Sequence, residues 1–443
     1  MLTVAYLANQ FPSPVEPYVI EEIEELRRRG VRVISGSVRK PPTDQVSAIR
    51  CAPEIVLQPL TTIVLLRAMW LCLRRWKRIA PLLTRVLFRG REGPVKRVKA
   101  LAHTWMGSCY AVLLQGRGVD HIHVHHGYFG SWIAMSAARL LGVGFSVTLH
   151  GSDLLLHGAY LDLKLETCTL CLTVSEYNRR YILQRYPSVA EEKVVVARLG
   201  VDVSECASER SESKADPLTL LAVGRLHAVK DHAFLVRACA QLRDHNLHFE
   251  CSIAGEGPER SRLESLIRKC DLEKQVSLLG HVARDDMNAL YDRADVVVLT
   301  SRSEGIPLVL MEAMARGKIV LAPAITGIPE LVIDDKTGFL YEPGSLSEFV
   351  ERLEFIRSFM IRPRMIRPPL IRSRMRAQSD PEHGSPLFSA TRQLDWVRYA
   401  ARVQVRNKFN RSRNLDSFSD MFLQRIAPRT ESVPHEDFVL QQI

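Results

Sequence analysis

The feature that most constrains the fold of this chain is an alternation of short β-branched segments with longer segments of helical periodicity. It begins at LTVAYLA (2–8), stops at 204–217, where Ser, Glu, Lys and Asp follow one another without periodicity, and then restarts. Such alternation predicts mostly parallel sheets with helices on both faces. The sequence therefore predicts two doubly wound α/β domains, 1–203 and 218–355, joined by a linker over 204–217. Ligands of such sheets bind beyond the carboxyl ends of the strands, so we expect the active site in a cleft between the domains.

A repeat ends the alternation after residue 355. Four pentapeptides, IRSFM, IRPRM, IRPPL and IRSRM, occupy 356–375. Proline interrupts helices, and a charge period of five matches the faces of neither a helix nor a strand. We predict a disordered or loosely extended basic insertion over 356–394. Helical character returns in 395–443, which we predict to contain C-terminal helices and a tail, and a helix there could pack back across the cleft.

The net charge of +11 is concentrated in two segments. Residues 356–413 contribute +11 and residues 67–99 contribute +10, so the rest of the chain is net negative. A basic surface can bind the phosphates of lipid, nucleic acid or substrate, or it can be a solvated face without a partner. Neither segment has the interleaved aromatic platform of a single-strand binder, so we expect no nucleic-acid partner.

The region 55–89 mixes large apolar residues with Arg and Lys. It predicts either a helix pair buried against the first sheet or an amphipathic helix on a membrane surface, with Trp70 and Trp76 near the headgroups. No stretch approaches the ~20 mostly apolar residues of a bilayer span. The amino terminus lacks a secretory signal pattern, and the nine cysteines are irregularly spaced. We therefore expect a cytoplasmic protein, with a peripheral position at the inner face of the cell membrane as the alternative.

The strongest chemical signal is SRSEGIPLVLMEAMARGK (301–318), where a strand end leads through a loop into a helix beginning near Leu308. Backbone N–H groups at a helix start favour anionic ligands. Glu304 and Glu312 are eight positions apart, which places them roughly on one helix face. Carboxylates accept hydrogen bonds from the vicinal hydroxyls of a sugar or ribose. The alternative is that these acids only complement the helix dipole.

Two further strand ends carry candidate residues. In VGRLHAVKD (223–231), Arg225 and Lys230 could clamp a diphosphate, or they could be two surface cations. In TLHGSD (148–153), His150 and Asp153 would face the cleft, although a strand-end histidine is often only a hydrogen-bonded core residue.

We expect no metal site in this chain. The sequence contains no Asp-x-Asp pair, which argues mildly against a metal-dependent reaction. The histidines of HIHVHH (121–126) alternate along one strand, so they do not all lie on one side of it. Tetrahedral ligation also needs residues that converge from more than one element.

Together these motifs resemble the retaining, nucleotide-sugar-dependent glycosyltransferases of the GT-B architecture, called glycosyl transferases group 1 (family 4), over roughly 1–355. The most specific element is the spacing of the two glutamates in SEGIPLVLMEAMARG, and AVGRLHAVK, SIAGEGPER, LGHV and TGIPELVIDDKTGFLYEPG add to it. The amino-terminal half, with QFPSPVEPYVIEEIEELRRRG, VHHGYFG, TLHGSD, TVSEYNRRYI and RLGVD, resembles exopolysaccharide and colanic-acid-type members. The segment 403–422 resembles the family's closing helices. The resemblance implies two Rossmann-like domains that face each other across a cleft.

The resemblance also implies a role for each matching residue. The implied donor-binding residues are Arg225 and Lys230 at the diphosphate, Glu312 at the ribose, Gly305, Ile306, Pro307, Leu308 and Val309 at sugar and phosphate, and His281 and Val282 beside the base. The implied catalytic residues are Glu304, which would hold the transferred sugar, and His150, which would lie near the reacting centre. Asp153 and Glu16 are the implied acceptor-binding residues. A UDP- or GDP-sugar would be the substrate, and no cofactor or metal is expected.

The implied function is retaining transfer of a sugar to a glycan, expected to be lipid-linked, in polysaccharide biosynthesis, with the basic apolar segment on anionic membrane. Two alternatives stay open: a sugar-nucleotide epimerase of the same architecture, and a non-catalytic descendant that binds membrane or glycan. The chain departs from the family at Asp231, where glycine is usual, and at the insertion, which separates the closing helices from the body.

Overall fold

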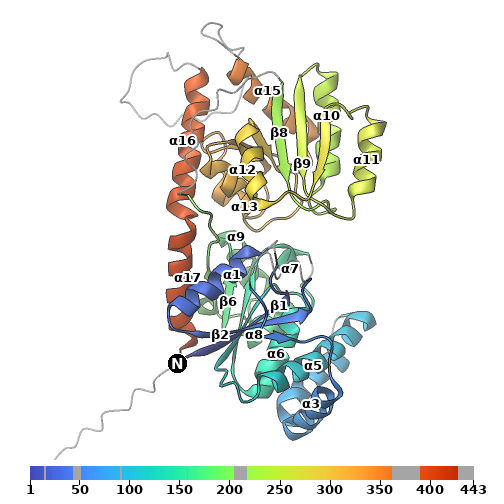
Figure 1. The fold of residues 1–443 in the computed structure, drawn as a ribbon, viewed down its shortest axis with the longest axis vertical. Coiled ribbons are helices and arrows are strands. Elements are labelled where there is room, and N and C mark those ends of the chain that lie inside the picture. Colours follow the sequence, from blue (N-terminus) through green and yellow to red (C-terminus); the bar gives the residue numbers. More distant parts are fainter. Residues whose placement is uncertain are drawn as a thin grey trace, which may run out of the picture.

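The computed structural model describes residues 1–13, 16–42, 51–89, 92–156, 158–203, 217–361 and 390–427. Their strands form two parallel sheets, one in each half of the chain (Figure 1). The first sheet has seven strands in the order β3-β2-β1-β4-β5-β6-β7, and the second has six in the order β10-β9-β8-β11-β12-β13. These are the two doubly wound α/β domains that the alternation predicts.

In the first domain the strands are β1 (Thr3–Gln10), β2 (Arg32–Arg39), β3 (Ile55–Val56), β4 (His121–His125), β5 (Gly144–Leu149), β6 (Leu170–Thr173) and β7 (Val194–Val196). Its helices are α1 (Pro17–Arg28), α3 (Thr62–Arg74), α4 (Trp76–Leu87), α5 (Pro94–Leu114), α6 (Phe129–Leu141), α7 (Ser152–Leu155), α8 (Leu161–Thr167) and α9 (Glu176–Arg185).

In the second domain the strands are β8 (Leu218–Val223), β9 (Phe249–Ala254), β10 (Val276–Gly280), β11 (Val296–Val298), β12 (Ile319–Pro323) and β13 (Phe339–Tyr341). Its helices are α10 (His232–Asp244), α11 (Arg260–Lys269), α12 (Arg284–Arg293), α13 (Leu308–Ala315), α14 (Ile328–Leu331) and α15 (Leu346–Ile361). The closing helices are α16 (Ala390–Lys408) and α17 (Arg411–Ile426).

Each sheet reverses its strand order once, beside β1 in the first domain and beside β8 in the second. In the first sheet β2 and β3 are added on one side of β1, and β4 begins the other side. In the second sheet β9 and β10 are added on one side of β8, and β11 begins the other side. The loops that follow the strands at such a reversal diverge and leave a crevice, which is where ligands of open α/β sheets bind. The topology therefore places the loops after β1, β4, β8 and β11 at the two candidate binding edges.

Helices α3 and α4 span most of the region 55–89, for which the sequence left two structures open, and contact with a membrane stays a prediction. One face packs into the core of the first domain through Ala68, Leu71, Ile79, Leu82 and Val86. The opposite face of α3 exposes large apolar side chains, and we call these residues the apolar face: Ile63, Leu66, Met69, Trp70 and Leu73. In the part of the chain that the structure describes, none of the helices is both long and apolar enough to traverse a bilayer.

The last two helices join the domains (Figure 1). Val405 of α16 is buried in the core of the second domain, whereas Phe422 of α17 is buried against the first. Helix α15 ends at Ile361 and helix α16 begins at Ala390. Both ends of the predicted insertion (356–394) are therefore helical and not disordered. The rest of that insertion, and the predicted linker up to residue 216, lie outside the described residues.

Candidate active site

The loops after β8 and β11 bring the predicted diphosphate and sugar residues together. The Lys230 ammonium donates to the Glu304 carboxylate over 2.5 Å. Both side chains are at most one-fifth exposed. Beside Glu304 in the chain, the buried Ser303 hydroxyl has no hydrogen-bond partner among the described residues. This loop pair therefore presents a cation, a carboxylate and an unpaired hydroxyl, which suit a ligand with both phosphate and sugar hydroxyls.

The turn that carries Lys230 explains the departure at Asp231. This residue has φ +47°, in the left-handed region that favours glycine and that aspartate tolerates better than most residues. Its carboxylate accepts from the Phe234 N–H and caps α10, and it pairs with Arg302 over 2.8 Å. These contacts offset the conformational cost, so the turn keeps the left-handed conformation in which glycine is usual.

Helix α13 positions the second glutamate and the predicted backbone contacts. The helix begins at Leu308, directly after Pro307, so the segment 305–309 forms the loop and the first turn. Glu312 lies one turn further on and accepts a hydrogen bond from the Tyr291 hydroxyl over 2.6 Å. Free N–H groups at the helix start favour anionic ligand groups. The helix therefore presents a donor-rich turn beside a fixed carboxylate.

The two domains touch beside this loop. A Cβ at Gly305 would lie 2.0 Å from the His150 carbonyl oxygen, and a Cβ at Gly151 would lie 2.7 Å from the Gly305 nitrogen. Only glycine permits so close an approach of the two backbones. Nearby, Glu330 of the second domain accepts from the backbone N–H groups that begin α9 of the first. Residues of both domains therefore converge on one site.

The remaining predicted donor residues lie on loops at the same edge. Arg225 follows β8 with an exposed side chain, and its positive charge acts on Glu16 and Tyr18 of the first domain. His281 is exposed and Val282 half-buried in the loop after β10. The structure places these residues at the predicted edge, and their contacts with a nucleotide stay predictions.

On the first domain, His150 is held by a chain of two hydrogen bonds. His125 Nδ1 lies 3.1 Å from His150 Nε2, and His125 Nε2 lies 3.1 Å from Glu22 Oε2. Because the carboxylate only accepts, His125 donates to it through Nε2, and His125 Nδ1 shares one hydrogen bond with His150 Nε2. Burial, together with His126 and His125, holds the pKa of His150 well below its ordinary value, so the ring is neutral at pH 7.

Asp153 organises the loop that carries His150. Its buried carboxylate accepts from the backbone N–H groups of Gly127, His150 and Gly151 over 2.7 to 3.3 Å. Burial alone would raise its pKa, but the bond and charge of His126 outweigh burial, and the pKa lies well below the ordinary value. The carboxylate therefore fixes the loop, and its predicted contact with an acceptor stays a prediction.

Glu16 reaches the same cluster through His126. Its Oε1 lies 3.0 Å from His126 Nε2. Burial opposes the charged form of His126, but hydrogen bonds and charges from Asp153 and Glu16 raise its pKa to about 9. Burial likewise opposes the Glu16 carboxylate, yet His126 lowers its pKa. A positive imidazolium thus lies between two carboxylates, and acceptor binding by Glu16 stays a prediction.

Glu22 and Tyr18 also belong to this cluster, although none of the motifs in the sequence indicated them. The Tyr18 ring packs on His150 at a centroid distance of 4.8 Å. Glu22 lies in a run of acidic residues that is typical of a solvent-exposed helix face, but its spacing relative to the apolar residues indicates burial. Val19, Glu22, Ile23 and Leu26 follow the i, i+3, i+4, i+7 pattern of a buried helix face, and all four are buried. A carboxylate on that face needs a buried polar partner, which is His125.

One cluster of possible metal ligands bears on the prediction that this chain has no metal site. The ligand atoms of Glu22, His123 and His125 lie within 4.8 Å of one another, and α1 supplies the second element that the strand alone lacks. The two ring nitrogens of His123 already contact the hydroxyls of Ser146 and Thr148. We therefore describe this cluster as a hydrogen-bond network, and the absence of a metal stays a prediction.

Comparisons with known proteins agree with this architecture. A model of Glycosyltransferase Family 4 matches residues 15–205, and a model of Glycosyl transferases group 1 matches residues 204–358. WcaL of Escherichia coli, named for colanic acid biosynthesis, is 37% identical over 168 residues, which cover 37% of this chain and 41% of WcaL. The amylovoran biosynthesis glycosyltransferase AmsK of Erwinia amylovora is 33% identical over 159 residues, which cover 34% of this chain and 39% of AmsK. The chain thus matches about two fifths of the length of these relatives.

Solved structures share the fold over nearly the whole chain. Anabaena HepE, solved in complex with UDP-glucose, superimposes with a TM-score of 0.64 at 18% identity and covers 96% of this chain and 100% of its own. At this identity the likeness concerns the fold alone. It confirms the predicted arrangement of two Rossmann-like domains.

Proposed function

Because the chain belongs to the glycosyltransferases of group 1 and family 4, we propose that it is a retaining glycosyltransferase of exopolysaccharide biosynthesis. It would move a sugar from a nucleotide-sugar donor to a glycan acceptor. One observation carries the proposal: the Lys230–Glu304 pair and the start of α13 meet the His150 loop at Gly305, so a donor between them would touch both domains. The relatives above are named as glycosyltransferases, which favours transfer over the epimerase and the non-catalytic alternatives.

The donor would bind with its diphosphate at Arg225 and Lys230. An Arg fork and a Lys point charge neutralise a leaving nucleoside diphosphate, so the proposal requires no metal or cofactor. Glu312 would accept from the ribose hydroxyls, and Glu304 from the sugar. The base would lie along His281 and Val282. HepE was solved with UDP-glucose, which makes UDP the first nucleotide to test.

Transfer would take place on one face of the sugar. The bond from the anomeric carbon to the phosphate oxygen breaks, and a bond to the acceptor oxygen forms on the same face. The leaving phosphate takes the acceptor's proton, and its negative charge is stabilised by Lys230 and Arg225. His150 is neutral, so it can donate or accept a hydrogen bond at the reacting centre without adding charge. Glu16 and Asp153 remain the proposed contacts of the acceptor side.

We propose a lipid-linked glycan as the acceptor and an anionic membrane as the surface on which the enzyme works. The apolar face of α3 lies among exposed cations, including Arg67 and Arg74. Large apolar side chains within a basic surface favour the interface of an anionic bilayer. The proposed location is therefore the cytoplasmic side of the cell membrane, in peripheral contact.

Nucleotide binding tests the donor site. We expect one of UDP, GDP and ADP to raise the melting temperature, because ligand at ~100 times its Kd stabilises the folded state by about 2.7 kcal/mol. Glu312→Ala and Lys230→Ala should each abolish the shift. The control variants Glu351→Ala and Lys336→Ala remove exposed charges of the same domain and should keep it. If none of the three nucleotides changes the melting temperature of the unmodified protein, the result would favour the alternative of a non-catalytic protein that binds membrane or glycan.

A further inference from the structure

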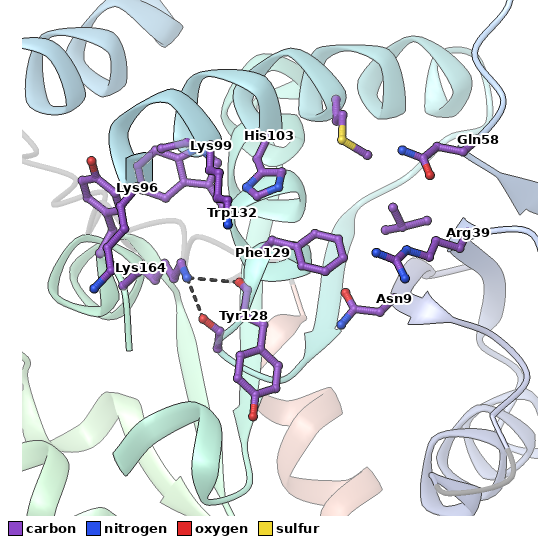
Figure 2. A pocket seen from close by; sticks show the side chains of 16 residues that line it. Asn9, Arg39, Gln58, Lys96, Lys99, His103, Tyr128, Phe129, Trp132 and Lys164 are labelled. Carbon is purple, nitrogen blue, oxygen red and sulfur yellow. Dashed lines mark hydrogen bonds between the residues drawn. The ribbon is translucent and has the colours of Figure 1, made fainter. Parts of the chain in front are cut away.

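A separate cavity of about 540 Å³ opens in the first domain, between α5 and the carboxyl ends of β1 and β2 (Figure 2). Its walls are mostly apolar and aromatic, with Phe129, Trp132 and Tyr160 among the lining residues. A cavity of this size accommodates a small-molecule ligand group. None of the residues to which we assign donor or catalytic roles lines it, so it is available for a different part of a substrate.

The charge of this cavity has one sign. Arg39, Lys96, Lys99 and Lys164 line it, and none of the carboxylates in the described part of the chain does. Helix α6 also begins here, so the positive end of its dipole adds to the same field. Like charges gathered in a concave site raise the local concentration of an anion. The cavity is therefore built for a negatively charged group next to an apolar one.

Two buried polar groups in the wall are incompletely paired. The Lys164 amino group is only 3% exposed, burial lowers its pKa to about 7, and it donates to the carbonyls of Gly127 and Tyr128 over 2.6 and 3.1 Å (Figure 2). These two bonds leave one N–H group of the protonated form unused, and an anionic ligand would favour that form. The Tyr160 hydroxyl is buried and has no hydrogen-bond partner among the described residues. Buried polar groups are rarely left unpaired, so both are free to bind a ligand oxygen.

The wall of the cavity is shared with the candidate active site. Gly127 donates its N–H to Asp153 and gives its carbonyl to Lys164, so this one residue contacts both sites. The Tyr128 hydroxyl lies 2.7 Å from Ser152 Oγ, beside the loop of His150. On the outer side, α5 exposes Val95 and Val98 next to the cavity's lysines. The cavity thus lies between the reacting centre and an exposed apolar surface.

We infer that this cavity binds the phosphate or diphosphate of the acceptor, a lipid-linked saccharide. The anionic group would contact Lys96, Lys99 and Lys164, and the first carbons of the lipid would lie against Phe129 and Trp132. The lipid would continue outward over α5, and the saccharide would pass Tyr128 towards His150. The inference rests on the proposed function, because it names the substrate class of the same reaction.

Geranyl diphosphate tests the inference, with geraniol and inorganic diphosphate as the comparison ligands. Binding to the full chain is measured by calorimetry in the presence of a saturating concentration of whichever of UDP, GDP and ADP raises the melting temperature, so that the proposed donor diphosphate site is blocked. We expect geranyl diphosphate to bind at least tenfold more tightly than either comparison ligand. The double variant Lys96→Glu/Lys99→Glu should weaken its binding at least tenfold. Lys269→Glu/Lys274→Glu makes the same change of charge on exposed lysines of the second domain and should have no effect.

Each other outcome overturns part of the inference. Equal binding of geraniol would mean that the cavity is only apolar, and equal binding of inorganic diphosphate would mean that it takes free phosphate. Unchanged binding in the cavity variant would place the lipid elsewhere. The melting shift that the nucleotide causes in Lys96→Glu/Lys99→Glu shows whether the donor site of this variant is intact. A normal shift together with lost binding of geranyl diphosphate supports the inference. A protein that binds geranyl diphosphate but no nucleotide would instead overturn the proposed function.

Discussion

At the residue scale, Glu22 lies two hydrogen bonds away from His150 and touches no part of the donor loops. Its carboxylate holds the Nε2 proton of His125, and His125 Nδ1 shares a hydrogen bond with His150 Nε2. A carboxylate that controls a histidine tautomer can affect catalysis strongly without contacting the substrate. We therefore regard Glu22 and His125 as positioning residues for His150.

Glu22→Gln tests this positioning. An amide can donate as well as accept, so it no longer requires a proton on His125 Nε2 and weakens the control over the hydrogen bond that orients His150. We expect kcat for release of nucleotide from the sugar donor to fall at least tenfold, with little change in KM and an altered pH profile. Glu24→Gln, an exposed neighbour on α1, should retain the profile of the unmodified enzyme. A Glu22→Gln enzyme with normal kcat at every pH would refute the role.

At the element scale, α3 packs one face into the domain core and exposes the other. Trp70 is 56% and Leu73 68% exposed, although fully burying such side chains is worth about 1.5 to 3 kcal/mol each. The Arg74 guanidinium lies 5.0 Å from the centre of the Trp70 ring, so cation and aromatic ring occupy the same surface. The sequence alone could not choose between a core helix and a surface helix, because this helix is both.

Vesicle binding tests the apolar face of α3. We expect the protein to sediment with vesicles that contain phosphatidylglycerol and much less with pure phosphatidylcholine. Trp70→Ser/Leu73→Ser should weaken this binding tenfold or more, because two side chains lose their burial in the interface. The variant Trp396→Ser/Tyr399→Ser removes equally exposed aromatic residues from α16 and serves as the control. Equal losses in both variants, or no loss in either, would argue against α3 as the contact.

At the scale of the whole molecule, α16 and α17 connect the two domains outside the site (Figure 1). Phe422 of α17 is fully buried and packs edge-on against His121 and His123, beneath the network that leads to His150. Arg411, at the start of α17, pairs with Glu21 and Asp202. The insertion before α16 therefore does not prevent the closing helices from docking.

Phe422→Ala measures how much this docking contributes. Removing a buried phenylalanine costs about 3 to 5 kcal/mol, which for a domain of this size lowers the melting temperature by roughly 6 °C or more. Gln424→Ala, an exposed position on the same helix, should change it by less than about 2 °C. The nucleotide shift should persist in both, because the donor residues belong to the other domain. Equal melting temperatures for the two variants would show that α17 is not held as described.

The sequence by itself determined the two-domain α/β architecture and the donor segments, because hydrophobic period and glycine placement are local properties. Local spacing also located Lys230, Glu304 and His150 after strand ends and Glu312 on the helix that follows Glu304. Only the tertiary structure decided that Lys230 meets Glu304 and that Glu22 reaches His125, because these contacts join elements far apart in the chain. It also decided which face of α3 is exposed and where a cationic cavity forms. Such features depend on how separate elements pack, and no single segment encodes them.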